Sequence, residues 1–202
     1  MGNKIKIKKK PAGRRPTNPS GSATRPWGKW IATAAGFLVV AAIVGVIALT
    51  PEALTGVPEG TETVAVAAPQ HVEGEIHEEG EVPAGGEHNP VWLNCGYYDT
   101  PVDSEFAVHS LEHGAVWITY NPEIGDAAID RLRGFVGRSE KVIVSPILDL
   151  ETPILATAWA QQLSLDSADD ERLEQFTNEF SGSANAPEPR GSCSGGVGTP
   201  SF

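Results

Sequence analysis

The feature that most constrains this chain is one uncharged apolar run, Ile31–Leu49. It contains 19 residues without a charged side chain. A helix of that length crosses a hydrocarbon core about 30 Å thick, because each residue adds about 1.5 Å. Trp27 and Trp30 stand at its start, where aromatic side chains favour the membrane interface. We therefore predict a single transmembrane helix at residues 30–50.

The charges divide at this run and predict its orientation. Nine of the 15 basic residues precede it, and the first acidic residue of the chain is Glu52. Beyond the run, 26 acidic residues face six basic ones. Basic flanks stay on the cytoplasmic side, so we expect a single-pass protein of the cell membrane. Residues 1–29 would form a basic cytoplasmic tail, and the rest would be extracytoplasmic. A cleaved signal peptide is the alternative, and cleavage would release the same outer domain.

The outer part divides by composition into three segments. Residues 51–70 are rich in Pro, Gly, Thr and Ala and are predicted to be a linker. Residues 71–180 contain all the patterned segments and are predicted to form one extracytoplasmic domain. Residues 181–202 are rich in Gly, Ser and Pro and are predicted to be a disordered tail.

Hydrophobic periodicity predicts an α+β domain with the order strand, helix, strand, strand, helix. The predicted elements are strand 115–120, helix 124–136, strand 141–148, strand 153–160 and helix 169–180. This order resembles the second half of a thioredoxin-like fold. The chain has no Cys-x-x-Cys motif, so such a fold would not imply redox chemistry.

All five histidines lie in the predicted outer part, and two of them form the sharpest chemical signal. His109 and His113 are four residues apart, and on a helix such a pair shares one face and can bind one metal ion. A third ligand could come from His88 or from Cys95. Imidazole and thiolate donors suggest zinc or copper. The only methionine is Met1, which argues against thioether-rich copper(I) handling.

Other interpretations of these residues remain open. His109-Ser-Leu-Glu-His113 also matches the His-x-x-Glu-His pattern of zinc hydrolases, in which Glu112 would be the catalytic base. The small domain argues against that reading, and the sequence favours a binding domain over an enzyme. Alternatively, the histidines could hydrogen-bond backbone groups and carboxylates such as Glu112 or Glu105, as in a structural or interaction module at the cell surface.

Two further points bear on partners and cysteine chemistry. The acidic outer part argues against nucleic acid as a partner, and the sequence identifies no protein partner beyond the membrane itself. Outside the membrane, Cys95 and Cys193 could form a disulfide. Two free thiols are equally compatible with the sequence.

Several segments resemble a known family. They are His71-Val-Glu-Gly74, Gly86-Glu-His-Asn-Pro90, Cys95-Gly-Tyr-Tyr98 and above all Val108-His-Ser-Leu-Glu-His-Gly-Ala-Val116. Together they resemble a family of uncharacterised, mostly actinobacterial, membrane-anchored proteins, catalogued as domain of unknown function 3105, over about residues 71–180. The resemblance implies an exported, anchored α+β domain and supplies no established activity.

Overall fold

The computed structural model describes residue 13 and residues 56–201. The predicted transmembrane helix at residues 30–50 lies outside the described residues, as does nearly all of the predicted cytoplasmic tail. Among the described residues, no helix has both the length and the apolar character needed to span a bilayer.

The domain is built on a mixed six-stranded sheet with the order β1-β8-β7-β5-β6-β4. Strands β4, β6 and β5 are parallel to one another, whereas β7, β8 and β1 continue the sheet in antiparallel pairs. The strands are β1 (Glu62–Thr63), β4 (Gly96–Tyr97), β5 (Val116–Tyr120), β6 (Val142–Pro146), β7 (Ile154–Ala158) and β8 (Gln161–Leu165). A separate pair of two-residue parallel strands, β2 (Gln70–His71) and β3 (Glu87–His88), lies beside the sheet.

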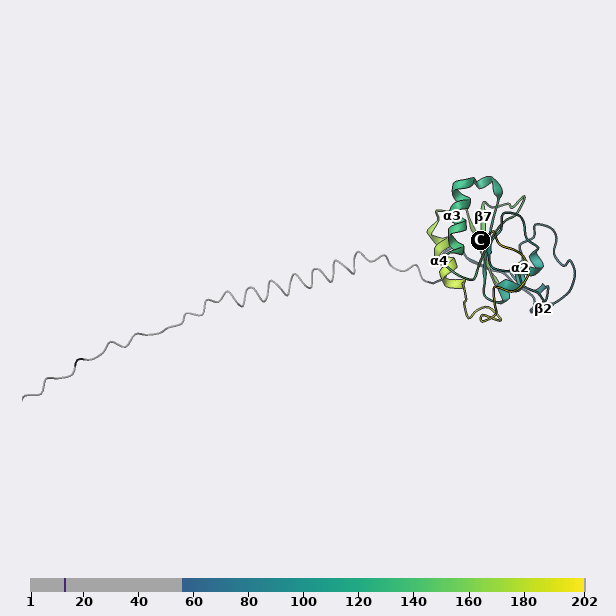
Figure 1. The fold of residues 1–202 in the computed structure, drawn as a ribbon, viewed down its shortest axis with the longest axis horizontal. Coiled ribbons are helices and arrows are strands. Elements are labelled where there is room, and N and C mark those ends of the chain that lie inside the picture. Colours follow the sequence, from purple (N-terminus) through teal and green to yellow (C-terminus); the bar gives the residue numbers. More distant parts are fainter. Residues whose placement is uncertain (1–12, 14–55, 202) are drawn as a thin grey trace, which may run out of the picture. The chain divides into compact units, whose positions relative to one another are not determined.

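Helices cover both faces of the sheet (Figure 1). Helices α3 (Asp126–Val136) and α4 (Glu171–Phe180) pack on one face, and α2 (Ser104–Glu112) packs on the other. Side chains alternate along a strand, so Val116 and Ile118 of β5 join the core under α3 and α4, while Trp117 joins the core under α2. Every residue of β5 is buried, which matches its continuous apolar sequence.

The structure confirms a mixed helix-and-strand domain and adds one strand to the predicted order. After β7 the chain turns through Trp159 and Ala160 and returns as β8. Ala160 adopts a positive φ of 59°, a conformation for which hairpin turns normally use Gly or Asn. Because no Gly or Asn marks this turn, the local pattern does not indicate that the predicted strand 153–160 is the first half of a hairpin. A short 3₁₀ helix, η1 (Pro122–Ile124), lies between β5 and α3.

Two predicted boundaries need correction. The linker predicted at residues 51–70 lies partly outside the described residues, at 51–55, but β1 within its described part pairs with β8 at the sheet edge. Residues 181–202 were predicted to be disordered, but residues 181–201 lie against the domain. Leu93 forms a parallel bridge with Val197 there. The glycines of this segment allow close packing: a Cβ on Gly191 would clash with the His113 ring, and one on Gly196 would clash with Trp92.

Candidate metal centre

The centre lies where the C-terminal end of α2 meets the small β2–β3 pair. His109 and Glu112 occupy the last turn of α2, and their spacing of three places them on one helix face. His71 and His88 face each other across the parallel β2–β3 pair, as register partners. The backbone N–H of Val72 donates to the carbonyl oxygen of His88 at 2.8 Å and fixes this pairing.

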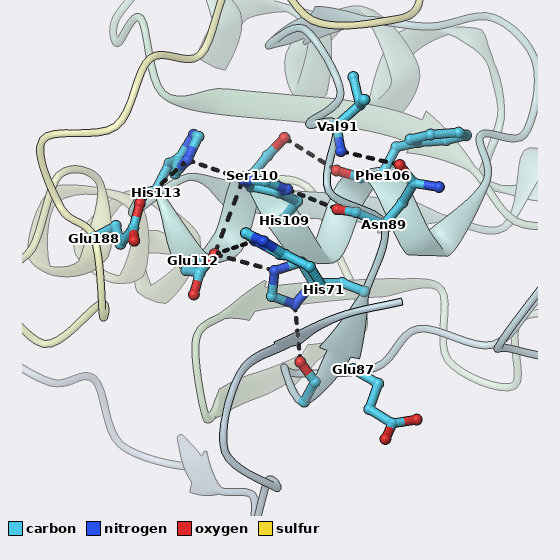
Figure 2. A network of polar contacts seen from close by, with 12 residues as sticks. His71, Glu87, Asn89, Val91, Phe106, His109, Ser110, Glu112, His113 and Glu188 are labelled. Atoms are coloured by element: carbon cyan, nitrogen blue, oxygen red, sulfur yellow. Dashed lines mark hydrogen bonds and ion pairs between the residues drawn. The ribbon is translucent and has the colours of Figure 1, made fainter. Parts of the chain in front are cut away.

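Four side-chain atoms converge at this point. The Glu112 Oε2 atom lies 3.0 Å from His88 Nε2, 3.6 Å from His71 Nε2 and 3.9 Å from His109 Nε2. The four residues offer ligand atoms that all lie within 4.8 Å of one another. Figure 2 shows the Glu112 carboxylate among the imidazole rings. Two ligands of one ion at 2.0–2.1 Å lie at most about 4.2 Å apart, so side-chain shifts of less than about 1 Å would bring this group to metal distances.

Backbone carbonyls fix the tautomers of the buried histidines. The Nδ1–H of His88 donates to the carbonyl oxygen of Gly86 at 2.8 Å, and that of His109 donates to the carbonyl oxygen of Asn89 at 2.7 Å. A carbonyl oxygen only accepts hydrogen bonds, so the proton of each neutral ring belongs on Nδ1. The Nε2 lone pair of His88 is therefore directed at Glu112, and that of His109 faces His113 Nε2 at 3.1 Å with Glu112 at 3.9 Å. Metal-binding histidines are oriented in this way by a partner on the other ring nitrogen.

His113 lies beside this group and continues it. Its Nδ1–H donates to the carbonyl oxygen of Ser192 at 2.6 Å, and its Nε2 lies 3.1 Å from His109 Nε2. Two ligands at 2.0–2.1 Å from one ion are 3.1 Å apart when they subtend roughly 100° at the metal. The exposed carboxylate of Glu188 lies 3.8 Å from His113 Nε2 on the outer side.

Burial favours a neutral imidazole at His109, and the helix end beside it favours a bound cation. Burial lowers the pKa of His109, and the hydrogen bond to the Asn89 carbonyl only partly opposes this effect. A neutral His109 keeps its Nε2 lone pair. The carbonyl end of α2 carries partial negative charge, which favours a cation near its last turn. Trp92 lines the site with ring centroids 5.8 Å from His109 and 5.2 Å from His113.

Cys95 is not available as a ligand, because it forms a disulfide with Cys193. The Cα atoms of the pair are 5.3 Å apart. The bridge ties the C-terminal segment to the domain, and the N–H of Cys95 donates to the Cys193 carbonyl at 2.8 Å. The hypothesis of Cys95 as a metal ligand is therefore wrong, and the disulfide is the alternative that the structure supports.

Sequence reasoning found part of this centre and missed part of it. It identified His88 and His109, which the structure brings together, and His113, which lies beside them. It missed His71, which is 17 residues from His88 in the sequence and reaches it only through the β2–β3 pairing. It named Glu112 as the base of a hydrolase or as a hydrogen-bond partner of the histidines, but not as a metal ligand; the structure places its carboxylate among the histidine nitrogens.

The comparisons with known proteins bear on the same region. Residues 71–195 match the model of a family described as protein of unknown function, DUF3105. The chain belongs to this family. The DUF3105 match spans all four clustered residues and both cysteines. Neither the curated proteins nor the solved structures contain a match to this chain.

Proposed function

We propose that this DUF3105 domain binds one divalent transition-metal ion through His71, His88, His109 and Glu112, with His113 beside them in contact with His109. The observation that carries the proposal is the convergence of three Nε2 atoms on the Glu112 carboxylate. Hydrogen bonds to backbone carbonyls hold two of these rings with their lone pairs directed inward.

The contacts within the group require a positive charge between electron-rich atoms. With Nδ1 protonated in each ring, His109 Nε2 and His113 Nε2 present lone pairs to each other at 3.1 Å. His88 Nε2 presents its lone pair to a carboxylate oxygen at 3.0 Å. Such contacts are repulsive unless a proton or a metal ion lies between the atoms. One divalent cation would attract all of these atoms at once.

The donor set favours zinc or copper(II). Imidazole nitrogen suits zinc, copper, iron and nickel, and a single carboxylate adds one negative charge. Both cysteines are oxidised in the disulfide, so no thiolate favours copper(I). Zinc imposes no geometric preference of its own and therefore tolerates a site assembled from a helix end and two short strands.

We further infer that this domain works outside the cytoplasmic membrane, anchored by the sequence at residues 30–50. The Cys95–Cys193 disulfide supports this location, because such bonds persist in oxidising compartments. The order β5, α3, β6, β7, β8, α4 supports a thioredoxin-like fold, with one parallel βαβ unit followed by an antiparallel hairpin and a helix. Binding rather than redox chemistry remains the proposed role, because no Cys-x-x-Cys is present.

Metal titration of the full-length protein tests this proposal. After removal of metal with a chelator, the wild type should bind one equivalent of zinc or copper(II), and a His88→Ala, His109→Ala double variant should bind none. His77→Ala is the matched control, because His77 bonds the Glu87 carbonyl rather than the cluster. A wild type that binds no more metal than the double variant would leave a structural or interaction module as the better account.

A further inference from the structure

One residue of the metal group differs from the others in its exposure. The side chain of His71 is 51% exposed, whereas His88, His109 and Glu112 are 0%, 5% and 6% exposed. A ligand that solvent can reach is the position at which an incoming donor can approach the ion. The other three ligands are closed to such an approach by the protein around them.

His71 also differs in how it is held. The rings of His88 and His109 are each fixed by a hydrogen bond from Nδ1 to a backbone carbonyl. Among the described residues, no carbonyl accepts from the His71 ring, whose contacts are the Glu112 oxygen and the neighbouring imidazole rings. Its strand, β2, has two residues and pairs only with β3. The ring can therefore leave the cluster by rotating its side chain, at the cost of few protein contacts.

Three of the four clustered ligands would remain when His71 leaves, because His113 lies beside the group and not within it. Three protein ligands and one open position are the arrangement found in zinc sites that accept an outside ligand. Because His88, His109 and Glu112 are held by buried contacts, the ion would stay in place until a new donor arrives. The exchange breaks one metal–nitrogen bond and forms one metal–donor bond, and it changes no oxidation state.

The surroundings of His71 favour the arrival of cations. Glu73 and Glu75 follow it within four residues, and Glu87 stands opposite Gln70 on β3; all three glutamates are exposed. In Figure 2 the Glu87 side chain extends away from the cluster. Negative charge beside an entrance raises the local concentration of cations and their association rate.

We propose that His71 is the exchangeable ligand of the centre and that the domain exchanges its metal ion with outside chelating donors through this face. This inference rests on the proposed metal binding. It assigns the domain to metal acquisition or transfer, in contrast to a closed site that only stabilises the fold. The partner is a small metal chelate or a protein that presents nitrogen, oxygen or sulfur donors to the exposed face.

Metal release to a chelator tests the exchange. The zinc-loaded full-length protein is mixed with excess chromogenic chelator, and release is followed for the wild type, His71→Ala and His88→Ala. His71→Ala should retain one equivalent of zinc but release it at least about tenfold faster, because one of the ligands is gone. Added imidazole should occupy the vacated position and restore slow release. His88→Ala should lose most of its zinc, and imidazole should not restore it, because that position is fully buried.

The outcomes separate this inference from the proposed function. A wild type without bound zinc would overturn both. If the wild type binds zinc and His71→Ala either releases it at the wild-type rate or gains nothing from imidazole, metal binding stands and the exchange role of His71 is wrong. A second measurement uses a Glu73→Gln, Glu75→Gln variant. It should bind zinc more slowly at low salt than the wild type, and the difference should disappear at high salt.

Discussion

Replacing Glu112 by Gln separates metal binding from ordinary structural hydrogen bonding. The substitution keeps the shape of the side chain and removes its charge. In the metal-free protein, the new amide group can donate to His88 Nε2, which now lies 3.0 Å from a carboxylate oxygen. The variant also removes a carboxylate that is 4% exposed, and burying a charge is costly. We therefore expect the metal-free variant to unfold at the same temperature as the wild type or higher.

With zinc bound, the wild type should have the higher melting temperature of the two, above that of Glu112→Gln. Glu112 is the only anionic ligand, and its oxygen is central to the group, so its loss should weaken zinc binding by at least about 100-fold; altering a residue that merely supports a ligand costs about 10–100-fold. When zinc is in excess, a 100-fold weaker affinity removes about 2.7 kcal/mol of metal-dependent stabilisation. For a domain of this size, that corresponds to about 5–11 °C of melting temperature.

The assay is thermal unfolding of both proteins, with zinc and after chelation, and Glu87→Gln is the matched control. Glu87 precedes His88, but its side chain is exposed and directed away from the cluster, so its zinc-dependent shift should equal that of the wild type. A Glu112→Gln variant that keeps the full shift would refute the ligand role. One that melts far below the wild type without metal would show that the carboxylate pairs with protonated histidines instead.

Three further predictions follow from the same contacts. His113→Gln should retain one equivalent of zinc with about 10–100-fold lower affinity in competition titrations, because His113 contacts the ligand His109; an unchanged affinity would show that His113 takes no part in the centre. Cys193→Ser should lower the free energy of unfolding by about 2–4 kcal/mol in denaturant titrations, because the bridge closes a loop of 98 residues, and a change below about 0.5 kcal/mol would contradict the ordered C-terminal segment. Burial alone would raise the pKa of Glu105, but N–H groups of Ile76 and His77 donate to it, and the pKa is lowered. The Glu105 carboxyl group therefore binds a proton more tightly in the unfolded chain than in the folded one. Its contribution to the free energy of unfolding should be fully present above about pH 4.5 and should be lost as the pH drops through the folded pKa. Glu105→Gln should reduce this loss of stability in acid, and an equal acid sensitivity of the wild type and the variant would contradict the stabilising role of the Glu105 carboxylate.

The parts of the fold that were predictable carry their signal in local periodicity. Strand β5 is a run of β-branched and aromatic residues, and α3 and α4 show apolar residues at helical spacing. Strand β8 was hidden because its hairpin turn uses Ala160, whose positive φ is supported by tertiary contacts: its N–H donates to the Ala84 carbonyl, and its carbonyl accepts from Val64. Sequence patterns around a turn do not indicate hydrogen bonds to such distant residues.

The C-terminal segment shows how composition can mislead. Its Gly and Ser content is typical of a flexible tail. Here glycine is required because the backbone passes directly against side chains, as at Gly191 over the His113 ring. The Lys141 ammonium group adds three hydrogen bonds to backbone carbonyls, those of His113, Pro189 and Gly191. These contacts join residues far apart in the sequence, so neither could be read from the local pattern.

Only the part of the candidate centre that lies on one helix could be predicted from local spacing. His109 and Glu112 share a helix face, and the sequence shows that spacing directly. His71 and His88 meet through the register of two-residue strands, which are too short to leave a periodic signal. Cys95 was a chemically reasonable ligand, and only its pairing with Cys193 excludes it.

The most direct test of the account is X-ray absorption spectroscopy of the zinc-loaded full-length protein. We expect a first shell of nitrogen and oxygen atoms at about 2.0–2.2 Å, the multiple-scattering signal of three or more imidazole rings, and no sulfur at about 2.3 Å. The imidazole signal should decrease by one ring in His71→Ala. A shell that contains sulfur, a shell of oxygen atoms without imidazole, or a protein that retains no zinc would contradict a metal centre built from His71, His88, His109 and Glu112.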